Sequence, residues 1–301
     1  MTTQRSSPRG VGVSLLASAL FASIFYLTAQ LSSSAEVVWA WRVFVTLGLY
    51  LLALWIPASR DELRVLFRRL RTRWWMPLLA LLLASIVGFE LWLFMWAPMH
   101  GHGLDASLGY LLLPITLVLG GRFILHAHVS RMQWAVVALA VVAVVVKIAA
   151  TPQLSWVTIA ICIPYAVYFV VRQRFGLDGP LVFGMELALM SPVAVVALVT
   201  AVPGPLPVPE LMGLAAVGLL GGFGMILYLA ASSMLSMPVF GLLSYVEPVL
   251  LVAVAFVLGE RMQGADAVAY GILAAALALL AVEGFRAARR RPPEPDVGAA
   301  D

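Results

Sequence analysis

Ten apolar blocks of roughly 20 residues each occupy almost the whole chain, and this division constrains the fold more than any single motif does. A helix of about 20 apolar residues crosses the hydrocarbon core of a bilayer, and in lipid a helix satisfies its own backbone polar groups. We therefore predict an all-α polytopic membrane protein with ten transmembrane helices. With Gly259–Gly264 read as a turn, the predicted spans are Gly10–Leu31, Val37–Pro57, Trp74–Ala97, Leu104–Leu125, Met132–Ala150, Leu154–Val171, Pro180–Val202, Leu211–Ala231, Pro238–Leu258 and Ala265–Phe285.

Composition independently excludes a protein that folds in water. The chain is 62% hydrophobic and only 11% charged, whereas soluble domains carry about 25% charged residues. Its mean hydropathy is +1.00, so the bilayer has to serve as the solvent for its surface. The single cysteine, Cys162, excludes an intrachain disulfide and a metal site built from cysteines.

Arginine is concentrated on every second connecting segment, and this pattern predicts the orientation in the membrane. Cytoplasmic loops carry an excess of Lys and Arg, so both termini are predicted to be cytoplasmic in a multi-pass protein of a bacterial-type plasma (inner) membrane. Arg261 is the main exception. The net charge of +4 is then explained by the arginines that set the orientation in the membrane. No nucleic-acid partner is predicted. The arginines of the predicted cytoplasmic side are Arg5, Arg9, Arg60, Arg64, Arg68, Arg69, Arg71, Arg73, Arg131, Arg172, Arg174, Arg286, Arg289, Arg290 and Arg291.

A motif occurs twice, once in each half of the chain. The first copy reads SLGYLLLP (Ser107–Pro114) and continues to LHAH (Leu125–His128). The second reads GLLSYVEP (Gly241–Pro248) and continues to LGER (Leu258–Arg261). Each places a Tyr three or four residues before a Pro inside an apolar helix.

The two copies lie five spans apart, and an odd separation means opposite orientation in the membrane. Inverted repeats with helices broken by Pro or Gly are typical of alternating-access transporters. The predicted organisation is a first five-helix repeat over residues 10–150, an inverted second repeat over residues 154–286, and a disordered cytoplasmic tail over residues 287–301.

These motifs also support a resemblance to a known family. In their order and spacing they resemble the EamA-type, RarD-like branch of the drug/metabolite transporter superfamily. The resemblance implies an inner-membrane carrier of two inverted five-helix repeats around a central cavity for a small organic solute. Members of that superfamily move amino acids, other metabolites or drugs, and the branch is named for a link to chloramphenicol sensitivity. The matching segments are DASLGYLLLP with SRMQW (Ser130–Trp134), AEVVWAWR (Ala35–Arg42), LFMWAP (Leu93–Pro98), GME (Gly184–Glu186), SYVEP and LGER.

The chain departs from the family pattern in two places, at Glu90 in the third span, where the branch it resembles carries an uncharged polar residue, and at one turn. The Gly-Glu-Arg of the second motif is replaced in the first by His126, Ala127 and His128. The departure weakens any role for this turn beyond closing two helices.

Four ionisable residues fall inside predicted spans: Glu90, Glu186, Glu247 and Arg42. A charge at the bilayer centre costs about 2.5–3.5 kcal/mol, so such a residue usually faces a cavity or a partner. Removal from water favours the neutral form of a carboxyl group, which can then exchange protons. The acids are candidates for proton coupling or for binding an amine. The alternative is a structural pair in which Glu36 or a cavity acid holds Arg42, whose long side chain can also reach the interface.

Aromatic residues and prolines complete the candidate site. Tyr110 and Tyr245 are predicted to line the solute path, with Pro114 and Pro248 as hinges, because a helical Pro frees backbone carbonyls that only protein or a wet cavity can satisfy. An ordinary packed kink is the alternative. An aromatic face beside Glu90 would suit an aromatic solute or an amphipathic amine. That face is formed by Trp92, Trp96, Tyr165 and Tyr168, for which lipid contact is the alternative.

The predicted function is secondary active transport of a small organic solute, an amino acid, amine, other metabolite or chloramphenicol-like drug. We expect export by alternating access with proton coupling, by a monomer or homodimer, without metal or cofactor. The histidines form two pairs, His100 with His102 and His126 with His128, which are predicted to lie on opposite sides of the membrane. Each pair offers two ligands, whereas a zinc site uses three or four. The alternative function is an intramembrane enzyme acting on a lipid or lipid-linked substrate, but the sequence has no HExxH, GxSxG or phosphate-loop motif.

Overall fold

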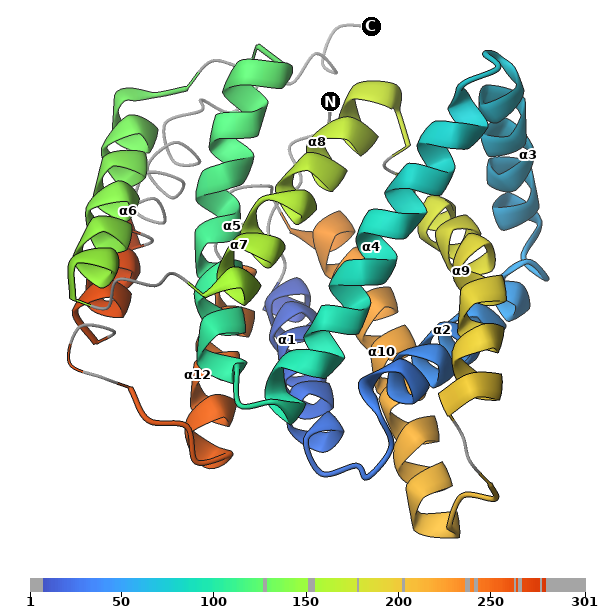
Figure 1. Ribbon diagram of the computed structural model, residues 1–301. Coiled ribbons are helices and arrows are strands. Elements are labelled where there is room, and N and C mark those ends of the chain that lie inside the picture. Colours follow the sequence, from blue (N-terminus) through green and yellow to red (C-terminus); the bar gives the residue numbers. More distant parts are fainter. Residues whose placement is uncertain are drawn as a thin grey trace, which may run out of the picture.

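The computed structural model describes residues 8–126, 129–150, 155–177, 179–201, 204–235, 239–240, 243–262, 264, 267–276 and 278–279. The predicted tail over residues 287–301, the end of the tenth predicted span and the start of the ninth lie outside the described residues. Every regular element among the described residues is a helix (Figure 1).

Seven helices of the described chain are long and apolar enough to cross a membrane, and three shorter apolar helices accompany them. The prediction of an all-α multi-pass membrane protein is therefore confirmed, while the count of ten spans stays a prediction. The helices are α1 (Pro8–Thr28), α2 (Ala35–Ala53), α3 (Pro57–Arg71), α4 (Met76–Met99), α5 (Gly103–Ile124), α6 (Arg131–Ala150), α7 (Trp156–Cys162), α8 (Pro164–Phe175), α9 (Pro180–Ala201), α10 (Val208–Met234), α12 (Val246–Val257) and Ala267–Ala276.

The arginine-rich segment after the second span is a helix, where the sequence analysis predicted a loop. Helix α2 ends at Ala53, four residues before the predicted boundary, and Pro57 opens α3. Proline suits the first position of a helix because its fixed φ matches the helix and its missing N–H would have no partner there. Leu66 and Leu70 are the buried residues of α3, while its arginines face outward.

The sixth predicted span is divided at Ile163. Pro164 has no N–H to donate to the preceding turn, so α7 ends at Cys162 and α8 begins at Pro164. The Thr116 hydroxyl of α5 donates to the Cys162 carbonyl at 2.7 Å and so satisfies an acceptor at the break. The sequence analysis did not predict this break, because Pro164 does not belong to the duplicated motif.

The second copy of the motif does not lie inside a continuous helix as predicted. Ser244 and Tyr245 form a turn, and α12 begins at Val246. Pro248 therefore lies in the first turn of α12, where the missing N–H costs no intrahelical hydrogen bond. The irregular backbone at Ser244 and Tyr245 lies before Pro248, so this proline does not cause the break.

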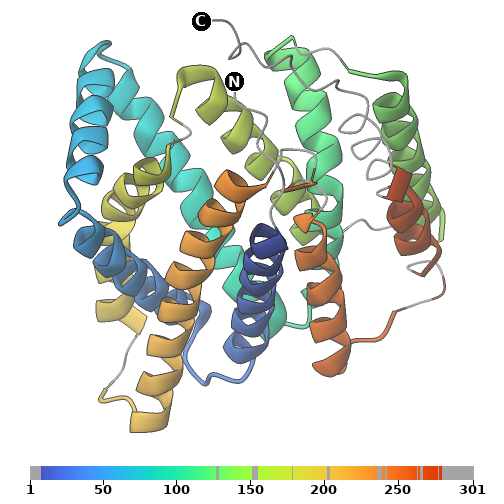
Figure 2. The ribbon, with the colours of Figure 1, turned by 180° about the vertical axis from the view of Figure 1, so that it is seen from behind.

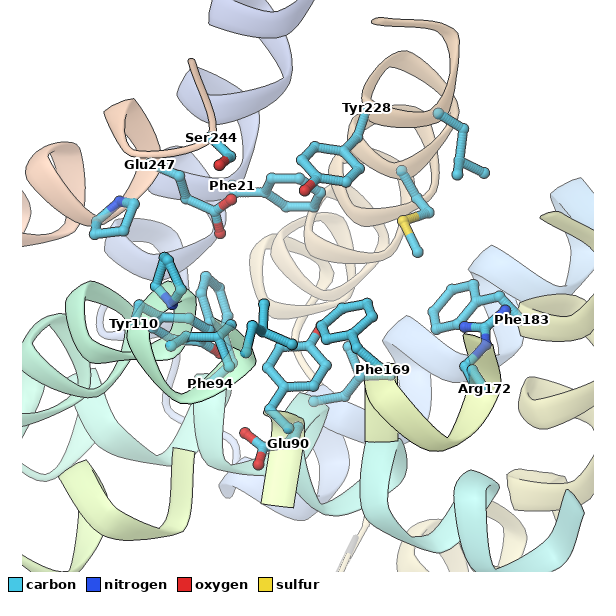
Figure 3. A pocket seen from close by; sticks show the side chains of 18 of the residues that line it. Phe21, Glu90, Phe94, Tyr110, Phe169, Arg172, Phe183, Tyr228, Ser244 and Glu247 are labelled. Carbon is cyan, nitrogen blue, oxygen red and sulfur yellow. The ribbon is translucent and has the colours of Figure 1, made fainter. Parts of the chain in front are cut away.

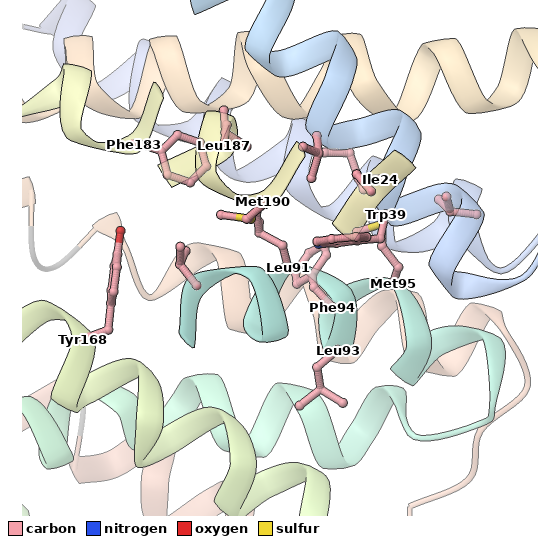
Figure 4. Close-up of a cluster of buried hydrophobic side chains, with 14 of the residues drawn as sticks. Ile24, Trp39, Leu91, Leu93, Phe94, Met95, Tyr168, Phe183, Leu187 and Met190 are labelled. Atoms are coloured by element: carbon pink, nitrogen blue, oxygen red, sulfur yellow. The ribbon is translucent and has the colours of Figure 1, made fainter. Parts of the chain in front are cut away.

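Two buried clusters hold the helices together. The larger joins α1, α2, α4, α9 and α10, and Figure 4 shows its centre, where Trp39, Leu91 and Met190 converge. The smaller joins α5, α6 and Ala267–Ala276. Figures 1 and 2 show these three helices together on one flank of the bundle and α2, α9 and α10 on the other.

Candidate functional site

A cavity of about 620 Å³ lies between the two flanks of the bundle. This volume is within the range of about 300–1,000 Å³ that small-molecule sites occupy. Its wall includes a series of aromatic rings: Phe94 lies 5.8 Å from Tyr110, Tyr110 lies 6.3 Å from Tyr165, and Tyr165 lies 4.7 Å from Phe169, centroid to centroid. Figure 3 shows this wall with carboxylates at its edges.

The cavity brings together most of the residues that the sequence analysis selected. They come from five helices, α2, α4, α5, α8 and α12, and from the turn before α12, which are far apart in the chain. The candidates in its lining are Arg42, Glu90, Tyr110, Pro114, Tyr165, Tyr245, Glu247 and Pro248.

The structure places four other candidates outside this lining. Trp92 donates from Nε1 to Glu36 at 3.2 Å, and Trp96 stacks on the rings of His100 and His102. These tryptophans belong to the end of α4 rather than to the cavity. The remaining two, Tyr168 and Glu186, form a separate buried cluster.

Tyr168 and Glu186 are bound to Arg172. The Tyr168 hydroxyl donates to Glu186 Oε2 at 2.7 Å and accepts a hydrogen bond from Arg172 Nη1, which lies 3.6 Å from the same Glu186 oxygen. Arg172 also donates from Nε to the Leu177 carbonyl at 2.6 Å and from Nη2 to the Gly179 carbonyl at 3.2 Å. The cluster therefore fixes the turn between α8 and α9 to both helices.

Glu90 has a very different environment from Glu186. It is 1% exposed on α4, and neither carboxylate oxygen has a hydrogen-bond partner among the described residues. The other lining residues near it are apolar or aromatic, including Leu91, Phe94 and Tyr165. An ionised carboxylate in such a place carries a large desolvation penalty unless a cation or water reaches it.

Arg42 does not pair with Glu36, which instead accepts the hydrogen bond from Trp92. Arg42 is 8% exposed, and its guanidinium carbon lies 5.5 Å from the centroid of the Phe94 ring. Glu247 lies in the first turn of α12 and attracts Arg42 electrostatically.

The sequence analysis missed several lining residues, chiefly Phe21, Thr46, Phe169, Tyr228 and Ser244. Helix α1 is apolar on all faces, so Phe21 gives no periodic signal that separates a cavity face from a lipid face. Glycines on α10 mark the places where cavity side chains pack against this helix. A Cβ at Gly224 would lie 3.1 Å from the Phe21 ring and one at Gly221 would lie 2.8 Å from Arg42 Nε, so these glycines admit cavity side chains.

The lining extends to one side of the bundle, which is the side that carries the arginine-rich segments. Leu125, Gln173 and Gly179 lie at helix ends on that side and belong to the lining. Among the described lining residues, none comes from the turns at the opposite ends of the helices. The described lining thus reaches helix ends only on the arginine-rich side, which we call the open side, and the opposite side is called the closed side.

Glu260 forms a latch on the closed side. Its carboxylate accepts hydrogen bonds from the backbone N–H groups of Gly103 at 2.6 Å and Leu104 at 2.8 Å, at the start of α5. Tyr270 donates to the Leu104 carbonyl nearby. A Cβ at Gly103 would lie 2.6 Å from Glu260 Oε1, so only glycine permits this approach. A carboxylate on the free N–H groups of a helix is favoured by both hydrogen bonding and the helix dipole.

Replacing Glu260 with alanine is expected to open the closed side. Hydrogen bonds to charged groups contribute about 1.5–3 kcal/mol each, so losing the pair should shift an open–closed equilibrium by tenfold or more. Spin labels at His100 and Arg261, in a Cys162→Ser background, should report a larger population of long distances by double electron–electron resonance. Glu260→Gln, which retains one acceptor oxygen, should give a smaller shift. An unchanged distance distribution in the alanine variant would exclude the latch.

Comparison with known proteins identifies relatives over most of the chain. An uncharacterized transporter of Haemophilus influenzae is 33% identical over 92% of this chain and 94% of its own length. An uncharacterized transporter of Pasteurella multocida is 31% identical over 94% of this chain and 99% of its own. The chloramphenicol-sensitive protein RarD of Pseudomonas aeruginosa is 33% identical over 86% of this chain and 89% of its own.

A solved crystal structure shares the fold, with a TM-score of 0.58 at 19% identity over 94% of this chain and 99% of that one. No protein-family model matches the chain. The resemblance that the motifs suggested is thus confirmed by relatives whose matches extend over nearly their full length. Together with the multi-pass helical fold, they show that the chain belongs to the RarD-like family of transporters.

Proposed function

We propose that the chain is a secondary carrier that exports a small organic solute by alternating access, with Glu90 as the proton-binding group. The observation that carries this proposal is a buried carboxyl group, without a hydrogen-bond partner among the residues that the structure describes, in a solute-sized aromatic cavity whose described lining reaches one side of the bundle. A buried acid inside a membrane protein is retained at an energetic cost and usually marks an ion or substrate path.

The arrangement of the helices supports two inverted repeats over residues 10–150 and 154–286. An inverted repeat relates each helix to the one five spans away. Under this relation, the contact between α1 and α10 corresponds to the contact of α7 and α8 with α4. The contact between α2 and α10 corresponds to the contact between α9 and α4. In the same way, the contact between α1 and α12 corresponds to the contact of α7 and α8 with α5. All of these helix pairs are in contact. The pairs α2 with α9 and α5 with α12 map onto themselves and are also in contact. Such internal symmetry allows one bundle to close either end of a central site.

The direction of transport follows from the open side. The positive-inside rule assigns the arginine-rich side to the cytoplasm, so a cytoplasmic solute would meet the cavity directly. The same rule supports cytoplasmic termini in a protein of a bacterial inner membrane. Protons moving inward through Glu90 would drive solute outward.

Reconstitution in liposomes tests the proposal. Radiolabelled amino acids, amines and chloramphenicol would be supplied outside, with the lumen about one pH unit more acidic than the medium, and then with this gradient collapsed. One proton exchanged per solute allows accumulation of up to about tenfold per pH unit. Accumulation that disappears when the gradient is collapsed is expected. Equal flux in both conditions would contradict proton coupling, and no flux of any solute would contradict a carrier for these classes.

A further inference from the structure

Arg42 is a buried cation with one donor atom that no described residue bonds. Its side chain is 8% exposed and lines the cavity, and its Nη1 atom has no hydrogen-bond partner among the described residues. A guanidinium stays charged at every physiological pH and carries five N–H donors in a planar fork. A buried donor on a charged group is costly to leave unpaired, so an anion that enters the cavity and accepts from Nη1 would stabilise Arg42.

The surroundings hold this guanidinium in place. The Phe94 ring lies beneath it at 5.5 Å, which is within the distance of a cation–π interaction. Gly221 of α10 leaves the space that its Nε atom fills, because a Cβ there would lie 2.8 Å away. Arg42 is thus fixed between α2, α4 and α10 beside the cavity and does not extend to the interface as the sequence allowed.

The other cation of the lining, Arg172, is accounted for within the protein. It is bonded to Tyr168 and to two carbonyls, and it lies 3.6 Å from Glu186. Its role is fixed by these contacts, which leaves Arg42 as the guanidinium of the described lining that a solute can bind.

Glu247 supplies the opposite charge in the same cavity. Arg42 and Glu247 attract each other, yet no ion pair joins them within the described part of the chain. They belong to α2 and α12, in different halves of the molecule. Phe21 and Tyr228, whose ring centroids are 6.3 Å apart, also line the cavity, and Figure 3 shows both close to Glu247.

We propose that the solute is a small zwitterion, with Arg42 as its carboxylate subsite, Glu247 as its ammonium subsite, and an apolar body held by the aromatic wall. This inference rests on the proposed function and names the substrate class of that cavity. A planar carboxylate matches the fork of a guanidinium and can accept two hydrogen bonds from it.

Other charge types fit the cavity less well. A simple amine would satisfy Glu247 but leave Arg42 without a partner. A phosphate or other multivalent anion would satisfy Arg42 but be repelled by the carboxylate of Glu247 in the same lining. A solute with one carboxylate and one ammonium group satisfies both subsites and leaves Glu90 available for a proton.

Three probes that share one phenyl body separate the two subsites. L-phenylalanine carries both charges, 3-phenylpropionate only the carboxylate, and phenethylamine only the ammonium group. Binding would be measured by calorimetry on the purified full-length protein in detergent, so that the result does not depend on transport. The native protein should bind phenylalanine at least about tenfold more tightly than either analogue, since each lost charge pair costs 1.4 kcal/mol or more.

Two variants assign the charges. Arg42→Gln should weaken phenylalanine binding by about 30-fold or more and leave phenethylamine binding unchanged. Glu247→Gln should weaken phenylalanine and phenethylamine and leave 3-phenylpropionate unchanged. Arg42→Lys, which keeps the charge without the planar fork, should retain part of the affinity for phenylalanine and guards against a variant that fails to fold.

Several results would overturn the inference. Equal affinity of the native protein for phenylalanine and phenethylamine would exclude a carboxylate subsite. A loss of phenethylamine binding in Arg42→Gln as large as the loss of phenylalanine binding would reduce Arg42 to a structural residue. Gradient-driven transport of chloramphenicol without binding of any of the three probes would refute the zwitterion and leave the carrier function standing. Failure of the liposome experiment with every solute would instead refute the function itself.

Discussion

Glu90→Gln is expected to abolish the response of transport to a pH gradient while leaving the protein folded. Glutamine has the shape of the protonated acid and cannot ionise, and the environment of Glu90 already favours an uncharged group. A solute accumulated about tenfold by a one-unit gradient in the native protein should only equilibrate in the variant. Uptake into liposomes with an acidic lumen measures the difference.

Asp61→Asn is a suitable control for this experiment. Asp61 is an exposed residue of α3 that pairs with the exposed Arg64, and neither residue lines the cavity, so neutralising Asp61 changes the charge of the protein without changing the cavity. It should accumulate solute as the native protein does. Gradient-driven accumulation by Glu90→Gln at the native level would show that the proton binds elsewhere, with Glu247 as the next acid to test.

Glu186→Leu is expected to destabilise the protein by about 3–5 kcal/mol, because it leaves the charge of Arg172 buried without its counterion. Tyr168 would also lose the acceptor of its hydroxyl. Thermal unfolding of the purified protein in detergent, followed by circular dichroism, should show a large decrease in the transition temperature. Tyr168→Phe removes the hydroxyl that bonds both Glu186 and Arg172 but keeps the two opposite charges together, so the loss of stability should be smaller than in Glu186→Leu.

A double variant separates the role of the ion pair from that of the packing. Glu186→Leu combined with Arg172→Met removes both charges and fills the space with apolar groups, which is often neutral for a buried pair. The double variant should therefore recover most of the stability lost in Glu186→Leu. Equal instability of the single and double variants would contradict a charge-based explanation and assign the loss to the turn carbonyls that Arg172 binds.

The sequence predicted the class of fold and most of the cavity because both depend on hydrophobicity. Span lengths follow from bilayer thickness, and polar residues inside apolar spans are costly enough to be informative. Glu90, Arg42 and Glu247 were found in this way, and the cavity contains all three.

Other features depend on contacts that a single sequence does not encode. Whether a buried acid is free or bonded depends on its neighbour, and Glu186 differs from Glu90 only because Arg172 and Tyr168 lie beside it. The turn before α12 and the break at Pro164 also depend on partners such as Thr116. In α3, burial of Leu66 and Leu70 orders a segment whose arginines suggested a loop.

The latch at Glu260 has a consequence for the two mouths of the cavity. Both motifs end in a left-handed turn residue, His126 at φ 55° and Gly259 at φ 91°, but the next residue is Ala127 in one and Glu260 in the other. An alanine side chain accepts no hydrogen bond, so the sequence does not repeat the Glu260 contact in the first motif. A ligand that approaches from the latched side binds only the fraction of molecules that are open there, and its apparent dissociation constant rises in inverse proportion to that fraction. The same site should therefore have a high apparent affinity for ligand on the arginine-rich side and a low one on the other, although its intrinsic affinity is the same.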